Sequence, residues 1–331
     1  MNSSYISPFA KPVYIMLKPI GSVCNLACEY CYYLEKSKFY PDVKNHIMTD
    51  QILEKFIKEY MECQTMQEVL FTWHGGETLM RPISFYKKAL ELQRKYAGGR
   101  QIDNCIQTNG TLLNDEWCQF FKENNFLVGV SIDGPQEFHD EYRRNRQGLP
   151  SFYKVMKGIE LLKKHGVEYN AMAVVNDYNV DYPLEFYNFF KELDCRFIQF
   201  APIVERIGRH KEGTKLSSPE EQDAAIELAP FSVDSEKWGD FPLRLVRRVA
   251  KRGCRQVLHP IIRFHLGELG RRTTRGLLLG PPLRSRRGNG VQWRRICLRP
   301  FRIPGIQTRE YPNKDINGDD VQSGTTKVWN G

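Results

Sequence analysis

The 331-residue sequence has no long apolar run and no recognisable secretory leader. Its densest late apolar stretch, "GLLLGPPL", is far shorter than the roughly 20 apolar residues that a helix needs to cross a bilayer. The opening "MNSSYISPFAKPVY" has lysine and prolines where a leader would have its apolar segment. We therefore expect a cytoplasmic protein without a membrane partner, whose nine cysteines are thiols or metal ligands rather than disulfides.

Acidic residues are scarce near the end of the chain. Residues 242–331 contain 17 Arg and 3 Lys against 5 Asp and Glu, a net charge of +15, so the first 241 residues carry −6. Arginine outnumbers lysine in this tail, whereas lysine outnumbers arginine before it. One interpretation is a basic segment that binds phosphates. Another is that the tail is not a normal protein sequence.

Strand and helix signals alternate through residues 1–206. Runs of β-branched and aromatic residues that end in Gly, Asn, Asp or Pro predict strands at 13–17, 68–74, 104–109, 126–133, 167–175 and 195–203. Helical patterns lie between them at 49–63, 82–97, 114–124, 151–165 and 181–193. Alternation of this kind predicts parallel βα units, and six units are too few for a closed eight-fold barrel. We predict an α/β fold, an open partial (β/α)6 barrel over 1–206, with its site at the carboxyl edge of the sheet.

Three cysteines lie close together in "CNLACEYCYY", residues 24–33: Cys24, Cys28 and Cys31. A structural zinc site takes four ligands, and a [4Fe–4S] cluster is normally held by four thiolates. Three thiolates would leave one iron open to a substrate or cofactor. A zinc site completed by a distant His or Cys, or three buried cysteines packed as small hydrophobes, are the alternatives. The remaining cysteines are scattered and are interpreted as structural: Cys63, Cys105, Cys118, Cys195, Cys254 and Cys297.

A CxxxCxxC motif after a first strand, with Tyr30 before the last cysteine, resembles the radical S-adenosylmethionine (SAM) superfamily. Further motifs narrow the resemblance to the anaerobic sulfatase-maturating enzymes over roughly residues 10–241: "WHGGETLM", "QTNGTLL", "VSIDGPQEFHDEYRRNRQG" and "IQFAPIVE". The resemblance implies a TIM-like radical SAM barrel. It implies SAM chelated by the open iron of a [4Fe–4S] cluster, and a 5′-deoxyadenosyl radical that oxidises a sulfatase Cys or Ser to Cα-formylglycine. A sulfatase polypeptide and a low-potential electron donor, such as flavodoxin or ferredoxin, are the implied partners.

The resemblance also implies the SAM contacts. Tyr30 and Val204 would lie near the adenine of SAM. The amino group would be met by Gly75, Gly76 and Glu77, and the carboxylate and ribose would be held by Ser131 and Arg143. Thr108 and Asn109 would line the same edge of the sheet. Glycines allow close backbone approach, and the Glu77 carboxylate suits an ammonium group. The neighbouring Arg144 leaves the Arg143 assignment open by one position. Thr78 stands where the family usually has proline, and His74 and His139 are assigned no role.

The family continues into a cysteine-rich SPASM domain with auxiliary [4Fe–4S] clusters and a proton-accepting Asp after a cluster cysteine. Residues 207–241 are interpreted as a linker or helical segment toward that domain, but only Cys254 and Cys297 follow it. The auxiliary ligands and the catalytic Asp are thus absent, and 242–331 is interpreted as an irregular, aberrant tail.

A displaced reading frame explains the tail. With suitable synonymous codons, reading from the second base turns 298–312 into "CDHFVFPEYKLGNI" and 242–264 into "LCGLFDEWLKEDVGRYFIQLFDS". We infer a one-nucleotide insertion near the Phe241 codon, so that the arginine excess is a by-product and nucleic-acid binding is not expected. This chain is then predicted to be defective in sulfatase maturation. Another peptide-modifying radical SAM enzyme and an inactive SAM-binding remnant are the alternative functions.

Overall fold

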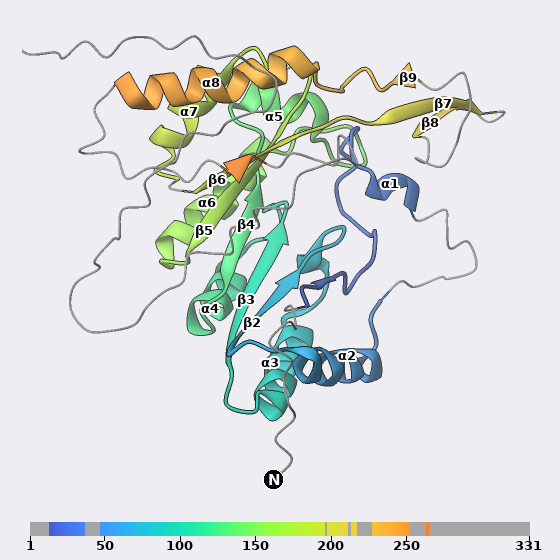
Figure 1. Cartoon of the computed structure of the whole chain (residues 1–331), viewed down its shortest axis with the longest axis vertical. Helices are drawn as coiled ribbons and strands as arrows, with labels where there is room; N and C mark the ends of the chain where they lie inside the picture. The colour runs from blue at the N-terminus through green and yellow to red at the C-terminus, as the bar shows by residue number, and fades with distance from the viewer. Residues whose placement is uncertain are drawn as a thin grey trace, which may run out of the picture. The chain divides into compact units, whose positions relative to one another are not determined.

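A parallel sheet orders the chain as β1-β2-β3-β4-β5-β6-β10. The computed structural model describes residues 13–36, 47–195, 197–210, 213–216, 227–251 and 263–264. The strands are β1 (Met16–Leu17), β2 (Glu68–Trp73), β3 (Gln101–Thr108), β4 (Leu127–Ser131), β5 (Tyr169–Val175), β6 (Ile198–Pro202) and β10 (Arg263–Phe264). Every neighbouring pair is parallel. The predicted α/β fold with six parallel strands, β1 to β6, is confirmed, and β10 adds a seventh strand that was not predicted. The sequence of strands can be followed by colour in Figure 1.

Helices connect successive strands, as parallel pairing requires. They are α1 (Tyr33–Lys36), α2 (Asp50–Cys63), the short 3₁₀ helix η2 (Thr78–Met80), α3 (Ile83–Tyr96), α4 (Asp115–Glu123), α5 (Gln136–Tyr142), α6 (Phe152–Lys164), α7 (Pro183–Glu192) and α8 (Ser235–Lys251). The predicted start signals act as caps: the Thr49 hydroxyl accepts from the Ile52 amide at 3.3 Å, and Asn114 Oδ1 accepts from the Trp117 amide at 2.9 Å. Gly166, with φ of +64°, follows the end of α6.

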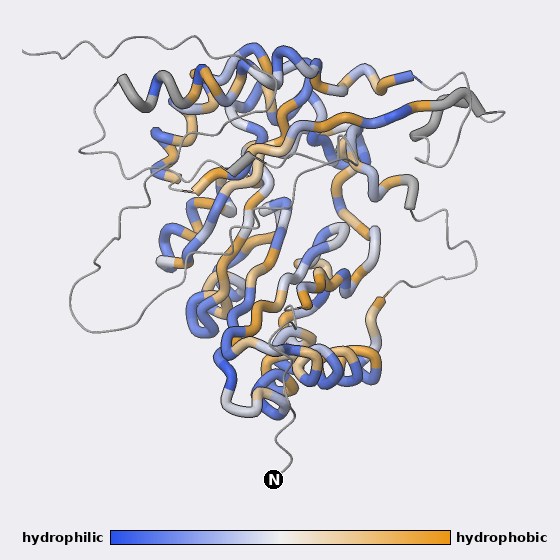
Figure 2. Tube along the Cα trace, viewed as in Figure 1, coloured by the Kyte–Doolittle hydropathy of each residue, from blue (hydrophilic) through white to orange (hydrophobic). Residues whose placement is uncertain are grey.

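The barrel core consists of strand residues packed against the apolar faces of the helices. Phe71 and Trp73 of β2, Val128 and Val130 of β4 and Phe200 of β6 are almost completely buried. Figure 2 shows hydrophobic residues interrupted by hydrophilic ones along the strands, and helices whose colour changes from one face to the other. Along β3 and β5, buried residues alternate with half-buried or exposed ones. One face of these strands therefore packs in the core, and the other is only partly covered.

The segment after the barrel contains structure that the sequence did not predict in detail. An antiparallel sheet has the order β8-β7-β9, with β7 (Arg206–His210), β8 (Gly213–Leu216) and β9 (Glu227–Leu228). Helix α8 runs through Phe241, where regular structure was expected to stop, and continues for ten residues to Lys251. Phe241 anchors it in the core, with its ring 5.3 Å from that of Phe200. The remainder of the predicted tail, apart from β10, lies outside the described residues.

Candidate active site

The three cysteines lie in one loop between β1 and α1. Cys24, Cys28 and Cys31 belong to a single apolar cluster with Leu26 and Tyr30. The loop is held by the end of α5 and the residues that follow it, because the amides of Ala27 and Glu29 donate to the carbonyls of Arg144 (2.8 Å) and Tyr142 (3.0 Å). The Cys31 amide donates to the Cys28 carbonyl at 2.9 Å and turns the chain between these two cysteines. The local fold therefore brings the three cysteines into one loop and one apolar cluster. That their thiols hold a cluster stays a prediction.

The thiols are free, and their surroundings disfavour isolated thiolates. Burial raises the pKa of Cys28 to about 12, although the nearby Arg143 lowers it. Burial also raises the pKa of Cys24. The thiols of Cys24 and Cys28 therefore need a positive partner to lose their protons, and bound iron would supply one. This donor set fits an iron–sulfur cluster, which distributes its thiolates over separate irons. Among the described residues, no three His, Cys, Asp or Glu side chains are grouped to hold a single metal ion.

Gly75 and Gly76 follow β2 and pack directly on the backbone that precedes Cys24. A Cβ on Gly76 would lie 2.0 Å from the Val23 carbonyl oxygen, and Gly75 has φ of +128°. The amides of Gly76 and Glu77 donate to the carbonyls of Gly21 and Val23, both at 2.8 Å. From the sequence, Gly75 and Gly76 were predicted to contact a ligand. The structure shows that each is also required by the contact between the two loops.

Glu77 is completely buried, and its carboxylate is engaged by the protein. Oε1 accepts from the Leu79 amide (2.9 Å) and the Thr108 hydroxyl (2.7 Å), and Oε2 accepts from the Asn109 amide (2.7 Å). Burial raises the pKa of Glu77, whereas these three donors lower it. The side chain thus joins the end of β2 to the end of β3. The amides of residues 75, 76 and 77 also donate within the protein. The backbone carbonyls of this loop, rather than its amides or the Glu77 carboxylate, are therefore the groups that could accept from a ligand's amino group.

Asn109 connects that carboxylate to the cysteine loop. Its Nδ2 donates to Asn25 Oδ1 at 2.8 Å and contacts the Cys24 sulfur at 3.6 Å. Its Oδ1 accepts from the amide and the hydroxyl of Thr111. Asn109 therefore lies beside a candidate cluster ligand, at the edge where the sequence placed it.

Ser131 ends β4 and accepts at 3.0 Å from Gln107 Nε2 on β3. Gln107 was not selected from the sequence, although it stands next to Thr108 in a quoted motif. Val204 lies just beyond β6 and is 36% exposed, so it is not an ordinary core valine. These side chains come from the same edge of the sheet, where parallel strands present their carboxyl ends.

The structure distinguishes Arg143 from Arg144. Arg143 is buried, and its Nε donates to Asp133 Oδ2 at 2.8 Å. Its guanidinium carbon lies 5.5 Å from the centre of the Tyr30 ring. Arg144 is exposed and donates back to carbonyls of α5. Burial, the largest single influence, disfavours the Arg143 charge, but Asp133, Tyr30 and Cys28 together outweigh it and raise the pKa of Arg143.

The two histidines are neutral structural groups at neutral pH. Burial, with the nearby Lys18, lowers the pKa of His74 to about 4, and its Nδ1 accepts from the Gly75 amide at 2.7 Å. Burial, with Arg143, lowers the pKa of His139 to about 4.

Asp133 was missed altogether by the sequence interpretation. Its only signal was a carboxylate in "VSIDG" at the end of a predicted strand, yet this carboxylate accepts hydrogen bonds from Tyr30, Arg143 and Val174.

Comparisons with known proteins agree with this geometry. The family model "Radical SAM superfamily" matches residues 19–190. The chain is 70% identical over 241 residues to a serine-type anaerobic sulfatase-maturating enzyme of Bacteroides thetaiotaomicron, which covers 73% of this chain and 58% of the relative. It is 38% identical over 210 residues to a cysteine-type anaerobic sulfatase-maturating enzyme of Clostridium perfringens, covering 62% of this chain and 56% of the relative.

A solved structure has the same fold. Native anSMEcpe with bound AdoMet and the Cp18Cys peptide matches with a TM-score of 0.62 and 31% identity, over 75% of this chain and 62% of that one. The chain therefore spans less than two thirds of the length of these relatives. Among its described residues, no helix is both long and apolar enough to span a membrane.

Proposed function

The chain belongs to the radical SAM superfamily, and from this premise we propose that it is a sulfatase-maturating type of radical SAM oxidoreductase. Cys24, Cys28 and Cys31 would hold a [4Fe–4S] cluster whose open iron binds SAM. When bound and reduced, that cluster would supply the electron for reductive cleavage of the SAM sulfonium. A Cys or Ser of a sulfatase is the proposed target, and Cα-formylglycine the product.

The observation that carries this proposal is the meeting of two loops at one edge of the sheet. The cysteine loop and the Gly75–Gly76–Glu77 loop are joined by backbone hydrogen bonds and by contacts too close for any Cβ. The SAM-bound anSMEcpe structure and the serine-type and cysteine-type relatives support this assignment.

Each candidate side chain has a role that its contacts allow. Tyr30 would face the adenine, and Arg143 would meet the carboxylate or ribose together with Ser131. Gly75, Gly76 and the backbone of Glu77 would meet the amino group, while the Glu77 carboxylate and Thr108 keep that loop in place. Asn109 would lie between SAM and the Cys24 sulfur, and Val204 would border the adenine.

The tail limits what this chain does. We propose that a one-nucleotide insertion near the Phe241 codon displaced the frame, with loss of the auxiliary-cluster cysteines and the proton-accepting Asp. The 70% identical relative matches 241 residues, 73% of this chain, so about a quarter of the chain has no counterpart in that match. The 331-residue chain should cleave SAM weakly, and a frame-restored chain should also mature a sulfatase in the cytoplasm with a low-potential donor such as flavodoxin or ferredoxin.

Mass spectrometry of a peptide product tests the reaction. A sulfatase-derived peptide with Cys or Ser in a C/S-x-P/A-x-R context is incubated anaerobically with SAM, reductant and the frame-restored chain. Formylglycine gives one mass change and a crosslink or thioether another, so a different peptide-modifying activity would be recognised. An unchanged peptide with intact SAM would indicate an inactive remnant.

A further inference from the structure

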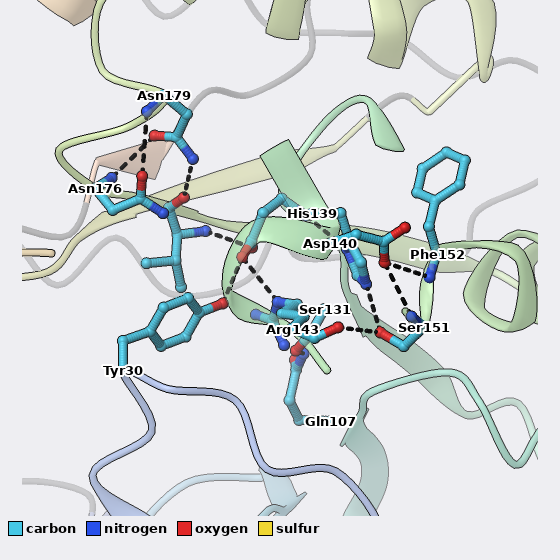
Figure 3. Close-up of polar contacts among 12 residues, drawn as sticks. Tyr30, Gln107, Ser131, His139, Asp140, Arg143, Ser151, Phe152, Asn176 and Asn179 are labelled. Carbon is cyan, nitrogen blue, oxygen red and sulfur yellow. Dashed lines mark hydrogen bonds and ion pairs between the residues drawn. The ribbon is translucent and has the colours of Figure 1, made fainter. Parts of the chain in front are cut away.

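One buried carboxylate joins three segments at the candidate SAM edge. Asp133 follows β4 and is completely buried. Its Oδ2 accepts from the Tyr30 hydroxyl and from Arg143 Nε (2.8 Å), and its Oδ1 accepts from the Val174 amide (2.9 Å) (Figure 3). Tyr30 comes from the cysteine loop, Arg143 follows α5, and Val174 lies in β5. Three donors occupy most of the acceptor positions of a carboxylate, so its orientation is fixed.

A second hydrogen-bonded path fixes the backbone of Arg143. The Asp133 amide donates to His139 Nδ1 (3.3 Å), so the proton of the neutral ring lies on Nε2. This Nε2 donates to Ser151 Oγ (3.0 Å), and the Ser151 hydroxyl donates to the Arg143 carbonyl (2.7 Å) (Figure 3). This path connects the backbone of Asp133 with the backbone of Arg143. The side chains of the same two residues form the ion pair. Arg143 is therefore held at both ends.

Stability alone explains this arrangement poorly. A buried ion pair costs much of its attraction in desolvation, and apolar replacements are often as stable. The network instead fixes the orientation of the Arg143 side chain. Its ion pair with Asp133 uses only Nε, and the described residues give the two terminal nitrogens of Arg143 no hydrogen-bond partner. Those nitrogens remain able to donate to an anion or a hydroxyl group. The Tyr30 hydroxyl donates to Asp133, which follows β4. This hydrogen bond fixes the position of the Tyr30 ring.

We propose that Asp133 is a positioning residue for SAM, which sets the Tyr30 ring and the Arg143 guanidinium before the ligand arrives, with His139 and Ser151 holding the Arg143 backbone. The inference rests on the proposed function, because Tyr30 and Arg143 are its SAM contacts. Asp133 itself does not touch the ligand. Its loss should therefore reduce SAM affinity without removing the cluster, whose ligands lie in another loop.

Asp133→Asn in the 331-residue chain tests the proposal. The amide keeps an acceptor for Val174 but removes the charge and presents N–H groups to two donors. After anaerobic reconstitution, we expect iron content like that of the wild type and SAM binding at least tenfold weaker. The electron paramagnetic resonance (EPR) change that SAM causes in the reduced cluster should also be reduced at SAM concentrations that saturate the wild type.

Asn104→Ala is the matched control. Asn104 is buried in β3, where its Oδ1 accepts from Trp73 Nε1 and Gln93 Nε2, away from the carboxyl edge. This variant should lose stability comparably, as measured by urea unfolding, yet bind SAM within twofold of the wild type. If it weakens SAM binding as much as Asp133→Asn does, Asp133 is merely structural and the proposal is overturned.

Ser151→Ala decides the matter if Asp133→Asn does not fold. It removes only the hydroxyl between His139 and the Arg143 carbonyl, and we expect SAM binding three- to tenfold weaker with normal iron. SAM binding within twofold of the wild type, in Asp133→Asn or, failing that, in Ser151→Ala, would overturn this inference alone. A wild-type chain with full iron and no SAM binding would overturn the proposed function and this inference together.

Discussion

Gly76→Ala should separate the two loops that form the site. The new Cβ would meet the Val23 carbonyl oxygen at 2.0 Å and the Ser22 carbonyl carbon at 2.7 Å, and both are backbone atoms that cannot rotate away. Overpacking of this kind costs about 1–3 kcal/mol. A shift that relieves the clash would weaken the two backbone hydrogen bonds at 2.8 Å, at about 0.5–1.5 kcal/mol each. The total, about 2–6 kcal/mol, would consume much of an ordinary folding free energy.

Two measurements on the 331-residue chain read out this change. Urea unfolding of the metal-free protein should show the loss of stability, and iron analysis after anaerobic reconstitution should show poor cluster loading. Gly239→Ala is the control, because a Cβ there meets nothing within 4 Å inside α8, and it should be neutral or stabilising by up to about 1 kcal/mol. If Gly76→Ala unfolds like the wild type and binds full iron, the packing argument is refuted.

Three further predictions follow from the contacts and from the reading frame. Thr108→Val removes a donor from the buried Glu77 carboxylate and should lower the free energy of unfolding by about 1–3 kcal/mol in urea titrations; an unchanged value would contradict the role of this hydrogen bond. Burial lowers the pKa of His139 in the folded protein to about 4, whereas in the unfolded chain it is about 6.5. The free energy of unfolding should therefore fall as the pH falls from about 6.5 toward 4, and His139 should account for about 2 kcal/mol of this loss between pH 7 and pH 5. Urea unfolding at both pH values should show a smaller drop for His139→Asn than for the wild type, and equal drops would contradict it. Sequencing the gene around the Phe241 codon should show an extra nucleotide, and only the frame-restored chain should yield formylglycine; formylglycine from the 331-residue chain would show that the displaced tail does not matter.

The local parts of the fold could be predicted from the sequence. Strand and helix patterns between residues 13 and 203 gave the order of the sheet, because alternation, caps and apolar periodicity are short-range signals. Helix α5 and the β7–β8–β9 sheet were missed. They are short and gain much of their stability from tertiary contacts, such as the Glu29 amide donating to the carbonyl of Tyr142, the last residue of α5, at 3.0 Å.

The candidate site was predicted as a set of residues but not as a set of contacts. The spacing of the motif predicted that the three cysteines act together. It could not show that the Glu77 carboxylate accepts from the Thr108 hydroxyl and the Asn109 amide. Asp133 and Tyr30 are 103 positions apart in the chain. Only the parallel register that brings β4 beside the cysteine loop places them together, and no local pattern encodes that pairing.

The most direct test of the central claim is metal analysis of the 331-residue chain with EPR spectroscopy. After anaerobic reconstitution, the account predicts about four irons and four sulfides per chain, as expected of one [4Fe–4S] cluster. It also predicts an EPR signal of the reduced protein that changes when SAM is added. Cys24→Ala, Cys28→Ala and Cys31→Ala combined should abolish both. Stoichiometric zinc in place of iron, or full iron in the triple variant, would contradict the claim.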